Sequence, residues 1–348
     1  MNPIDIIKQY ADSSLRHTGR ARAETDGFSL RHNILQHTRF RLTLSRIAEL
    51  HYYSQKNQAG GGLLIVGGSG IGKSSALSHY HQLFPKVQES QFTRIPVLLV
   101  TTPASPTVKN MAEAILTAMN DPMATRGSAE EKTLRIYQLF ERCKVELLLI
   151  DEFQHFYYAH TIVEFRRITD WLKNFISVTD KAVVLCGLPE AEMVVQTNEQ
   201  LARRFSSKYT LTPFNLDPKE DFNEFRGILR SLQEALPLPV EIPLHEANLA
   251  KCFLVASNGL LDYVRKILEG AVSIAGAAGH QSLDLPVFAA GFKKEVWIDV
   301  GDRLNPFHPE SPLRALNRPG EPFYASHKRH TIGSPLARRL NLSSERIA

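Results

Sequence analysis

Residues 67–74 read Gly67-Gly68-Ser69-Gly70-Ile71-Gly72-Lys73-Ser74 and directly follow a short apolar run, 63–66. This matches GxxxxGK[ST], a loop between a strand and a helix whose glycines let successive backbone N–H groups face one centre. The N-terminus of the following helix adds a partial positive charge there, which suits the loop to phosphate groups. The pattern predicts that Lys73 contacts the β- and γ-phosphates of a nucleotide such as ATP, and that the Ser74 hydroxyl is a ligand of Mg²⁺. The alternative is a glycine-rich turn with an incidental lysine.

Three further apolar runs share the length and character of 63–66, and they predict a parallel sheet. They are 97–100, 147–150 and 182–185. None of them alternates polar with apolar residues, as expected of strands that are buried on both faces. Stretches of helical periodicity separate the runs, at 74–84, 108–119, 129–143 and 161–178. This alternation of strands and helices predicts a doubly wound α/β core.

The character of the chain changes after Pro213, where helix-like stretches dominate. They cover 218–235, 245–257 and 260–278, and they predict a small helical domain. We expect four parts: a helical and basic N-terminal extension at 1–60 with an amphipathic helix at 34–53, an α/β nucleotide-binding core at 61–213, a helical lid domain at 214–300, and a basic, Pro-rich tail at 301–348. The tail is expected to bury little core and to order on a partner, or only to aid solubility.

The chain has 348 residues and a formal net charge of +5, which excludes a strongly polybasic protein. Residues 303–348 carry eight Lys and Arg against three Asp and Glu, whereas residues 1–302 balance at 33 against 33. Basic ends favour an acidic or polyanionic partner, and solvated termini explain them equally well. Cys143, Cys186 and Cys252 fall singly, so neither a disulfide framework nor a zinc site is expected. With no apolar segment of signal or membrane length, we expect a cytoplasmic protein without membrane contact.

The run 147–150 ends in an acidic pair, Asp151-Glu152. An Asp that ends a strand near the phosphate loop can hold the Mg²⁺ shell, and the adjacent Glu can orient and deprotonate an attacking water. Alternatively, the two carboxylates only favour the N-terminus of the next helix. Together with the loop at 67–74, the pair predicts ATP hydrolysis. Gln154 and His155 follow, and they either sense the γ-phosphate or cap the next helix.

Two arginines, Arg203 and Arg204, follow the fourth apolar run. Ring-forming NTPases complete each site with a cation from the neighbouring subunit, which stabilises charge on the γ-phosphoryl oxygens. Arg203 and Arg204 lie where such an arginine finger is expected, and we favour Arg204. The alternative is an ordinary charged helix face with Phe205 in the core.

Four elements together resemble the TniB/TnsC group of AAA+ ATPases, which regulate DNA transposition. They are the loop 67–74, Asp151-Glu152-Phe153-Gln154-His155, Gly187-Leu188-Pro189-Glu190-Ala191, and the segment 201–205. The resemblance covers roughly residues 30–275 and extends in role to the phage Mu B protein and IstB-type helpers. It implies a Walker A loop that, with Ser75, binds ATP, a Walker B pair at Asp151 and Glu152, and slow ATP hydrolysis regulated by DNA or partners.

The resemblance also implies partners. In this family, ATP drives assembly of a homo-oligomeric ring or filament around duplex DNA, without sequence preference, and the assembly links a TniQ-type target-selection adaptor to the transposase. The family's DNA-facing loop follows the second strand, where Thr107 and Lys109 offer a hydroxyl and a charge to backbone phosphates. The alternative is that Thr107 caps a helix and Lys109 faces solvent.

Two positions depart from the AAA+ pattern. Cys186 and Gly187 end the fourth run, where these proteins often place an Asn or Thr that senses the γ-phosphate. The lid arginine often follows a Gly that opens the last lid helix, and here Arg265 is the nearest candidate after Gly259. We therefore expect hydrolysis to be slow or partner-dependent. Two other functions stay open: a helicase-loader-like ATPase of DNA replication, and a signalling P-loop NTPase that binds only protein partners.

Overall fold

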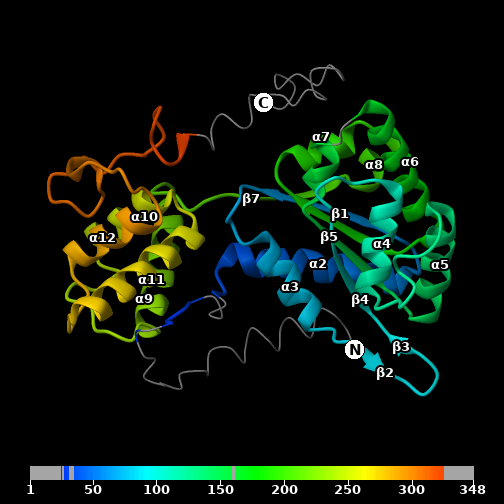
Figure 1. Ribbon diagram of the computed structural model, residues 1–348, viewed down its shortest axis with the longest axis horizontal. Coiled ribbons are helices and arrows are strands. Elements are labelled where there is room, and N and C mark those ends of the chain that lie inside the picture. Colours follow the sequence, from blue (N-terminus) through cyan, green and yellow to red (C-terminus); the bar gives the residue numbers. More distant parts are fainter. Residues whose placement is uncertain (1–24, 26, 31–34, 159–160, 325–348) are drawn as a thin grey trace.

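The computed structural model describes residues 25, 27–30, 35–158 and 161–324 of the chain. Figure 1 shows an α/β domain beside a helical domain. The α/β domain contains a five-stranded parallel sheet in the order β4-β5-β6-β1-β7. Its strands are β1 (Gly62–Gly67), β4 (Val97–Thr101), β5 (Leu147–Asp151), β6 (Ala182–Gly187) and β7 (Ser207–Leu211). The parallel sheet followed by a helical region confirms the predicted fold class.

The four apolar runs form β1, β4, β5 and β6, as the sequence predicts. β5 and β6 are buried along their whole length because other strands lie on both sides and helices cover both faces. β7 was not predicted, because it lies at the edge of the sheet and exposes most of its residues. Its sequence, Ser-Lys-Tyr-Thr-Leu, therefore lacks the continuous apolar run of a central strand.

Helices pack on both faces of this sheet, over separate hydrophobic clusters. One cluster includes Leu44 and Ile47 from α2 and Leu77 from α3, and the other includes Ile115 from α4 and Phe140 from α5. The helices of the domain are α2 (Thr38–Asn57), α3 (Lys73–Gln82), α4 (Val108–Ala118), α5 (Ala129–Arg142), α6 (Ile162–Thr179), α7 (Glu190–Gln196) and α8 (Glu199–Arg204). A short hairpin, β2 (Val87–Gln88) and β3 (Thr93–Arg94), precedes β4, and a 3-10 helix, η2 (Phe153–Tyr158), follows β5.

The helical domain has its own core, which includes Phe225, Phe253 and Phe288. Its elements are α9 (Lys219–Glu234), α10 (Ala247–Ser257), α11 (Leu261–Ala278), α12 (Leu285–Glu295) and η3 (Asp302–Leu304). The sequence pattern predicts the first three of these helices but not α12, which packs along α11. In the part of the chain that the structure describes, no helix combines the length and apolarity that a bilayer crossing requires.

The structure corrects, for residues 301–324, our expectation that the Pro-rich tail buries little core. Phe307, Leu316 and Phe323 are buried in the core of the helical domain. Isolated apolar residues between prolines carry no periodicity, so the sequence pattern could not reveal this packing. Residues 325–348 lie outside the described residues, and they hold five Lys and Arg against one Glu, while 301–324 hold three of each sign. The basic excess of the C-terminal end thus falls within residues 325–348.

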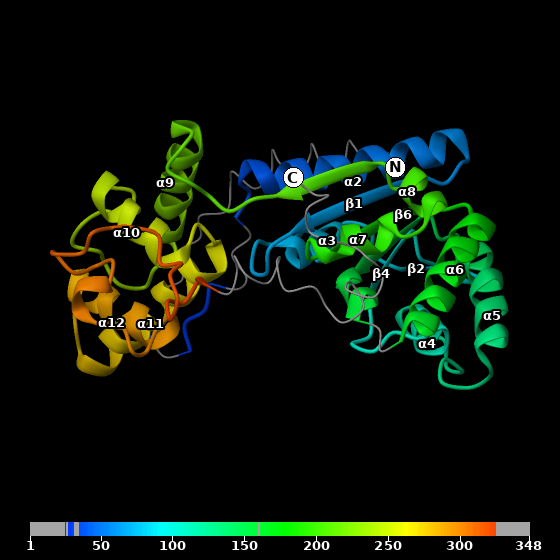
Figure 2. The same cartoon turned by 90° about the horizontal axis from the view of Figure 1, so that it is seen from above.

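The two domains meet around Phe214 and Gly259. The backbone N–H of Phe214 donates to the Gly259 carbonyl oxygen over 3.0 Å. Gly259 has a φ of +71°, and a Cβ there would lie 2.0 Å from the Phe214 oxygen, so only glycine fits. Arg39 of α2 pairs with Asp221 of α9 at 2.6 Å, and its guanidinium lies 4.1 Å from the centre of the Phe214 ring. Figure 2 shows α2 running along the sheet, with its first turn at the end nearest the helical domain.

Candidate nucleotide site

The carboxyl ends of three neighbouring strands bring the sequence-predicted loop and acidic pair to one edge of the sheet. β6 lies between β5 and β1, so Gly187 at its end separates Asp151 from Gly67. The register pairs Val66 of β1 with Gly187 of β6. In open α/β sheets, ligands bind outside the carboxyl ends of the strands. This edge is therefore the candidate functional site.

The loop at 67–74 has the backbone geometry that its glycines predict. Gly70 and Gly72 have φ values of +75° and +98°, which side chains other than glycine rarely adopt. α3 begins at Lys73 with Gly72 as its N-cap, and glycine offers no side-chain acceptor to the first N–H groups of the helix. A Cβ built at Gly68 or Gly72 meets nothing within 4 Å among the described atoms. The loop thus faces open space with N–H donors, as a phosphate site requires.

Lys73 is the cation of this loop. Its side chain is buried, and its Nζ donates to the carbonyl oxygens of Gly67 at 2.9 Å and Gly68 at 2.8 Å. An ammonium has three donors, so one remains for an anion above the loop. Burial lowers the pKa of Lys73 from its ordinary value, and the nearby carboxylates of Asp151 and Glu152 oppose that shift. Exposed hydroxyls of Ser74 and Ser75 follow in the first turn of α3.

The acidic pair ends β5 in an unusual backbone conformation. Asp151 is buried, and its Oδ1 accepts from the backbone N–H of Glu152 at 2.8 Å. Glu152 has a φ of +55°, a left-handed conformation that is uncommon for a residue with a side chain. Its side chain is 41 % exposed at the sheet edge. A buried carboxylate next to a half-exposed one fits the separate roles that the sequence predicts for Asp151 and Glu152.

The described residues offer few protein ligands for a metal ion at this edge. Among them, no group of three or more His, Cys, Asp or Glu side chains is placed to hold one. Mg²⁺ at nucleotide sites commonly takes one or two protein oxygens and completes its shell with phosphate and water. The Ser74 hydroxyl and the Asp151 carboxylate are oxygen ligands of that kind.

Gln154 links the acidic pair to the end of β6, which our sequence analysis did not predict. Its side chain is buried, its Oε1 accepts from the backbone N–H of Leu188 at 3.0 Å, and its Nε2 donates to the Glu152 carboxylate. His155 is more distant, with its Nε2 at 3.8 Å from Glu152 Oε2. The one sequence signal for this link is the missing polar side chain at Gly187.

The helical domain reaches the loop through the start of α11. A Cβ built at Gly70 would lie 3.4 Å from the Cβ of Asp262. The carboxylate of Asp262 pairs with the Nζ of Lys266 at 2.7 Å. Arg265 lies three residues after Asp262, a spacing that places both on one side of the helix. Burial lowers the pKa of Arg265, and Asp262 and Glu269 oppose that shift. The predicted lid arginine therefore belongs to the helix that approaches the phosphate loop.

The two predicted finger arginines lie near the amino ends of the strands, on the side of the sheet opposite the nucleotide site. They end α8, just before β7 begins beside Leu63 at the amino end of β1. Arg203 is 78 % exposed and pairs with Glu199 of its own helix, whereas Arg204 is 26 % exposed with its Nη2 at 3.7 Å from Asp180. The structure thus does not bring either arginine to the nucleotide site of its own chain.

The predicted DNA contacts lie at the start of α4, after β4. Thr107 caps this helix: its hydroxyl accepts from Asn110 N at 3.2 Å, and the Asn110 side chain accepts from Thr107 N at 2.6 Å. Capping is the alternative that the sequence left open for Thr107. Both Thr107 and Lys109 are exposed, so neither is excluded from a second contact with a phosphate.

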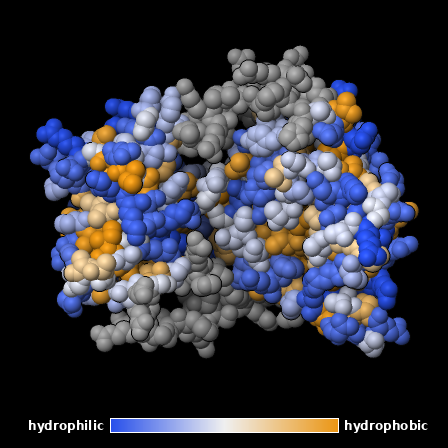
Figure 3. All heavy atoms as spheres, viewed as in Figure 1, coloured by the Kyte–Doolittle hydropathy of each residue, from blue (hydrophilic) through white to orange (hydrophobic). Residues whose placement is uncertain are grey.

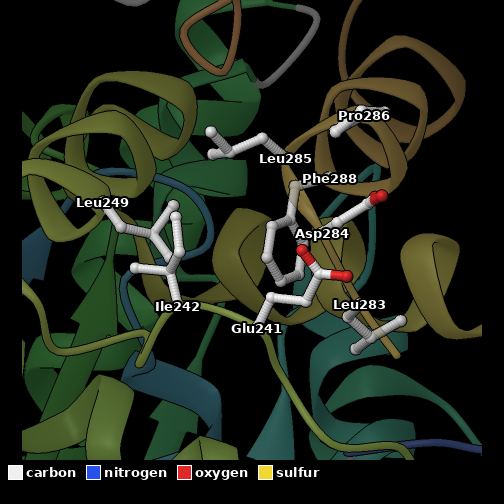
Figure 4. Close-up of a pocket in the computed structure, with 8 residues that line it drawn as sticks. All are labelled: Glu241, Ile242, Leu249, Leu283, Asp284, Leu285, Pro286 and Phe288. Carbon is white, nitrogen blue, oxygen red and sulfur yellow. The ribbon is translucent and has the colours of Figure 1, made fainter. Parts of the chain in front are cut away.

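A cavity in the helical domain does not compete with this site. Its volume is about 170 Å³, which is smaller than the roughly 300–1,000 Å³ of typical ligand pockets. Figure 4 shows apolar side chains around it, with the carboxylates of Glu241 and Asp284 near the Phe288 ring. These acidic groups disfavour phosphate, so the cavity is not a second nucleotide site. The face drawn in Figure 3 is mostly hydrophilic, with scattered hydrophobic patches on both domains.

Comparisons with solved structures find similar folds. The ORC2 protein of Aeropyrum pernix in ADPNP–ADP complexes matches with a TM-score of 0.58 at 16% identity, over 79% of this chain and 72% of that one. The Aeropyrum pernix ORC1 protein in complex with DNA matches at 0.55 and 16%, over 75% and 66%. Drosophila ORC bound to DNA matches at 0.52 and 13%, over 87% and 75%. These low identities show the fold alone, which is that of AAA+ ATPases.

A family comparison identifies the group within that fold. The search of curated proteins found no match. The family model described as Bacterial TniB protein matches residues 29–215, more than half of the chain. That range contains the phosphate loop, the acidic pair and both arginines of α8. The chain therefore belongs to the TniB family of AAA+ ATPases, which are associated with transposition.

Proposed function

We propose that this protein is an ATP-dependent, DNA-binding regulator of transposition. In this proposal it oligomerises on duplex DNA and links a TniQ-type target-selection adaptor to the transposase. The observation that carries the proposal is the meeting of Lys73 and the Asp151-Glu152 pair at one sheet edge, in a chain of the TniB family. The similarity to ORC structures, two of them bound to DNA, is consistent with a DNA-binding AAA+ protein.

The residues of the site divide the work of ATP hydrolysis. The N–H groups of residues 68–74 and Ser75 bind the phosphates, and Lys73 contacts the phosphoryl group that is transferred. Ser74 and Asp151 would hold Mg²⁺, which neutralises charge on the phosphate oxygens when bound. Glu152 accepts a proton from the water that attacks the γ-phosphorus as the bond to the ADP oxygen breaks.

Arginines from two places complete the proposed site. Arg265 lies on the lid helix, and it would close over the phosphates from the same chain. Arg203 and Arg204 lie at the opposite edge of the sheet, so they would act only on a nucleotide held by a neighbouring subunit. Arg203 is the more exposed of the two, and Arg204, our first choice from the sequence, is partly engaged by Asp180.

Mixing experiments test the finger in trans. We expect Arg204→Ala or Arg203→Ala to preserve ATP binding by the isolated subunit and to lower turnover in the assembly by about 10²–10³-fold, because one donor to the transition state is lost. Mixing Arg204→Ala subunits with Glu152→Gln subunits should restore turnover, since the second kind supplies the arginine and the first supplies the base. ATP turnover by the separate and mixed proteins is the measurement.

The control for these variants is Arg142→Ala, which removes an exposed arginine from the end of α5. It should leave turnover unchanged. If either finger variant alone keeps full turnover in the assembly, that arginine is not the finger. If mixing restores nothing although both kinds of subunit assemble together, the arginine does not act in trans.

DNA-dependent turnover tests the proposed function. We expect duplex DNA to stimulate ATP hydrolysis, and electron microscopy to show assemblies on DNA only with ATP and Mg²⁺. The stimulation should fall steeply with added salt, because phosphate contacts release counterions. Lys109→Ala should weaken it, whereas Lys251→Ala, which removes an exposed lysine from the helical domain, should not.

Three results would contradict the proposal. Monomers alone in the presence of ATP, Mg²⁺ and DNA would refute it. Stronger stimulation by single-stranded DNA, or co-purification with a helicase, would support a helicase loader instead. Salt-insensitive binding to a protein partner, with no effect of nucleic acid, would support a signalling NTPase.

A further inference from the structure

We propose that Gln154 is a positioning residue that holds the Glu152 carboxylate from the end of β6. It would take the place of the polar side chain that this strand lacks at Gly187. The inference rests on the proposed hydrolysis of ATP and deepens it, because it names what orients the base. Three features of the structure support it: the two contacts of the Gln154 amide, the close approach at Gly187, and the backbone of Glu152.

The two contacts of Gln154 determine the orientation of its amide. Its oxygen accepts from the N–H of Leu188 at 3.0 Å, and its nitrogen donates to the Glu152 carboxylate. Rotating the amide by 180° would set the NH₂ group against the Leu188 N–H and the oxygen against a carboxylate, so both contacts would become repulsive. Only 3 % of Gln154 is exposed, so water competes little for either contact. The amide is therefore a bridge with a defined direction.

Gly187 supplies the space that this bridge occupies. A Cβ at residue 187 would lie 2.5 Å from Gln154 Oε1, 3.0 Å from the Gln154 backbone nitrogen and 3.1 Å from the Ala191 Cβ. A side chain at the end of β6 and the present position of the Gln154 amide are thus mutually exclusive. The absence of an Asn or Thr side chain at residue 187 is therefore what allows Gln154 to be buried there.

Glu152 needs an external contact because its own backbone does not fix its side chain. The residue has a φ of +55° and lies between the end of β5 and the start of η2, so it belongs to neither element. Its side chain is 41 % exposed, and the Nε2 of His155 lies 3.8 Å from its carboxylate. A hydrogen bond from a buried amide therefore selects one carboxylate position. A general base has to lie within hydrogen-bond reach of the proton that it accepts.

Kinetics of two independent variants test this role. Gln154→Met keeps the length of the side chain but removes both hydrogen bonds, and Gly187→Ala displaces the amide without changing it. Each should lower kcat for ATP by about 10–100-fold, the usual effect of losing a residue that orients a catalytic group. The KM and the affinity for a fluorescent ATP analogue should be unchanged. Measurements use the full chain with Mg²⁺ and duplex DNA.

Double variants show whether both changes act through Glu152. The combination of Gln154→Met with Gly187→Ala should be no slower than either single variant, because both break the same bridge. Adding Gln154→Met to Glu152→Gln should not lower the residual turnover further. Two matched controls should keep wild-type kcat. Gln196→Met alters an exposed glutamine that also donates to a glutamate, and Gly227→Ala adds a Cβ where the described structure has nothing within 4 Å.

Each other outcome overturns the inference in a distinct way. If Gln154→Met has the wild-type kcat, Gln154 only fills space. If it weakens binding of ATP but not of ADP, Gln154 senses the γ-phosphate directly. Additive losses in the double variants would mean that Gln154 and Gly187 act separately. A wild-type chain without turnover would refute the proposed ATPase function itself, whereas normal wild-type turnover with an active Gln154→Met refutes only this inference.

Discussion

Lys73→Ala is expected to weaken ATP binding by about 10–100-fold and to abolish assembly on DNA. A hydrogen bond from a charged group contributes about 1.5–3 kcal/mol, so the one bond that the free donor of Lys73 makes to a phosphate oxygen corresponds to one to two factors of ten. Lys73 is suited to make it because it is already buried in the loop, with its Nζ held by Gly67 and Gly68. Titration with a fluorescent ATP analogue measures the affinity, and electron microscopy reports assembly.

A second lysine separates this effect from a general loss of packing. The Nζ of Lys86 donates to the carbonyl oxygen of Ala118 at 2.9 Å, so Lys86→Ala removes a similar bond elsewhere. It should leave ATP affinity unchanged. Thermal unfolding of both variants without nucleotide checks that the fold persists. Unchanged ATP affinity in Lys73→Ala would show that residues 67–74 are not the phosphate loop.

Glu152→Gln is expected to lower ATP turnover by about 10²–10⁴-fold, which is the usual contribution of a general base. ATP binding should persist, because Lys73 and the loop are unchanged and the uncharged amide adds no repulsion to the phosphates. The ATP-bound assembly on DNA should therefore accumulate rather than turn over. Phosphate release measures the first effect, and the lifetime of the assembly after dilution measures the second.

Glu164→Gln is the matched control for this variant. It makes the same substitution at a partly exposed carboxylate in the first turn of α6, and it should retain wild-type turnover. Normal turnover by Glu152→Gln would exclude Glu152 as the base. Loss of ATP binding in Glu152→Gln would also contradict the assignment, because a base for water is not required to hold the nucleotide.

The sheet was predictable where strands are buried on both faces and not where they are exposed. The runs that form β5 and β6 consist almost wholly of apolar residues, so their composition predicts that they are buried. β7 and residues 301–324 do not, since an edge strand needs few apolar residues and an irregular segment has no period. Phe307 and Phe323 show that single aromatic residues can anchor such a segment to a domain core.

The parts of the candidate site that local sequence motifs define were predictable. The phosphate loop and the acidic pair each depend on neighbours in the sequence and on the ends of parallel strands. The contact between Gln154 and Leu188 joins residues 34 positions apart, and it depends on how η2 packs against β6. The sequence therefore showed the departure at Gly187 but not the side chain that occupies its place.

Within the described residues, the chain passes between its two domains twice. Leu30 and Leu35 lie with the core of the helical domain, Phe40 and Leu44 lie under the sheet, and the chain returns at Phe214. Two connections define an axis, so we expect any movement of the helical domain against the sheet to be a rotation about one line rather than a motion in all directions. A protease cut in the first connection would remove this restriction and leave the two domains covalently joined through the second.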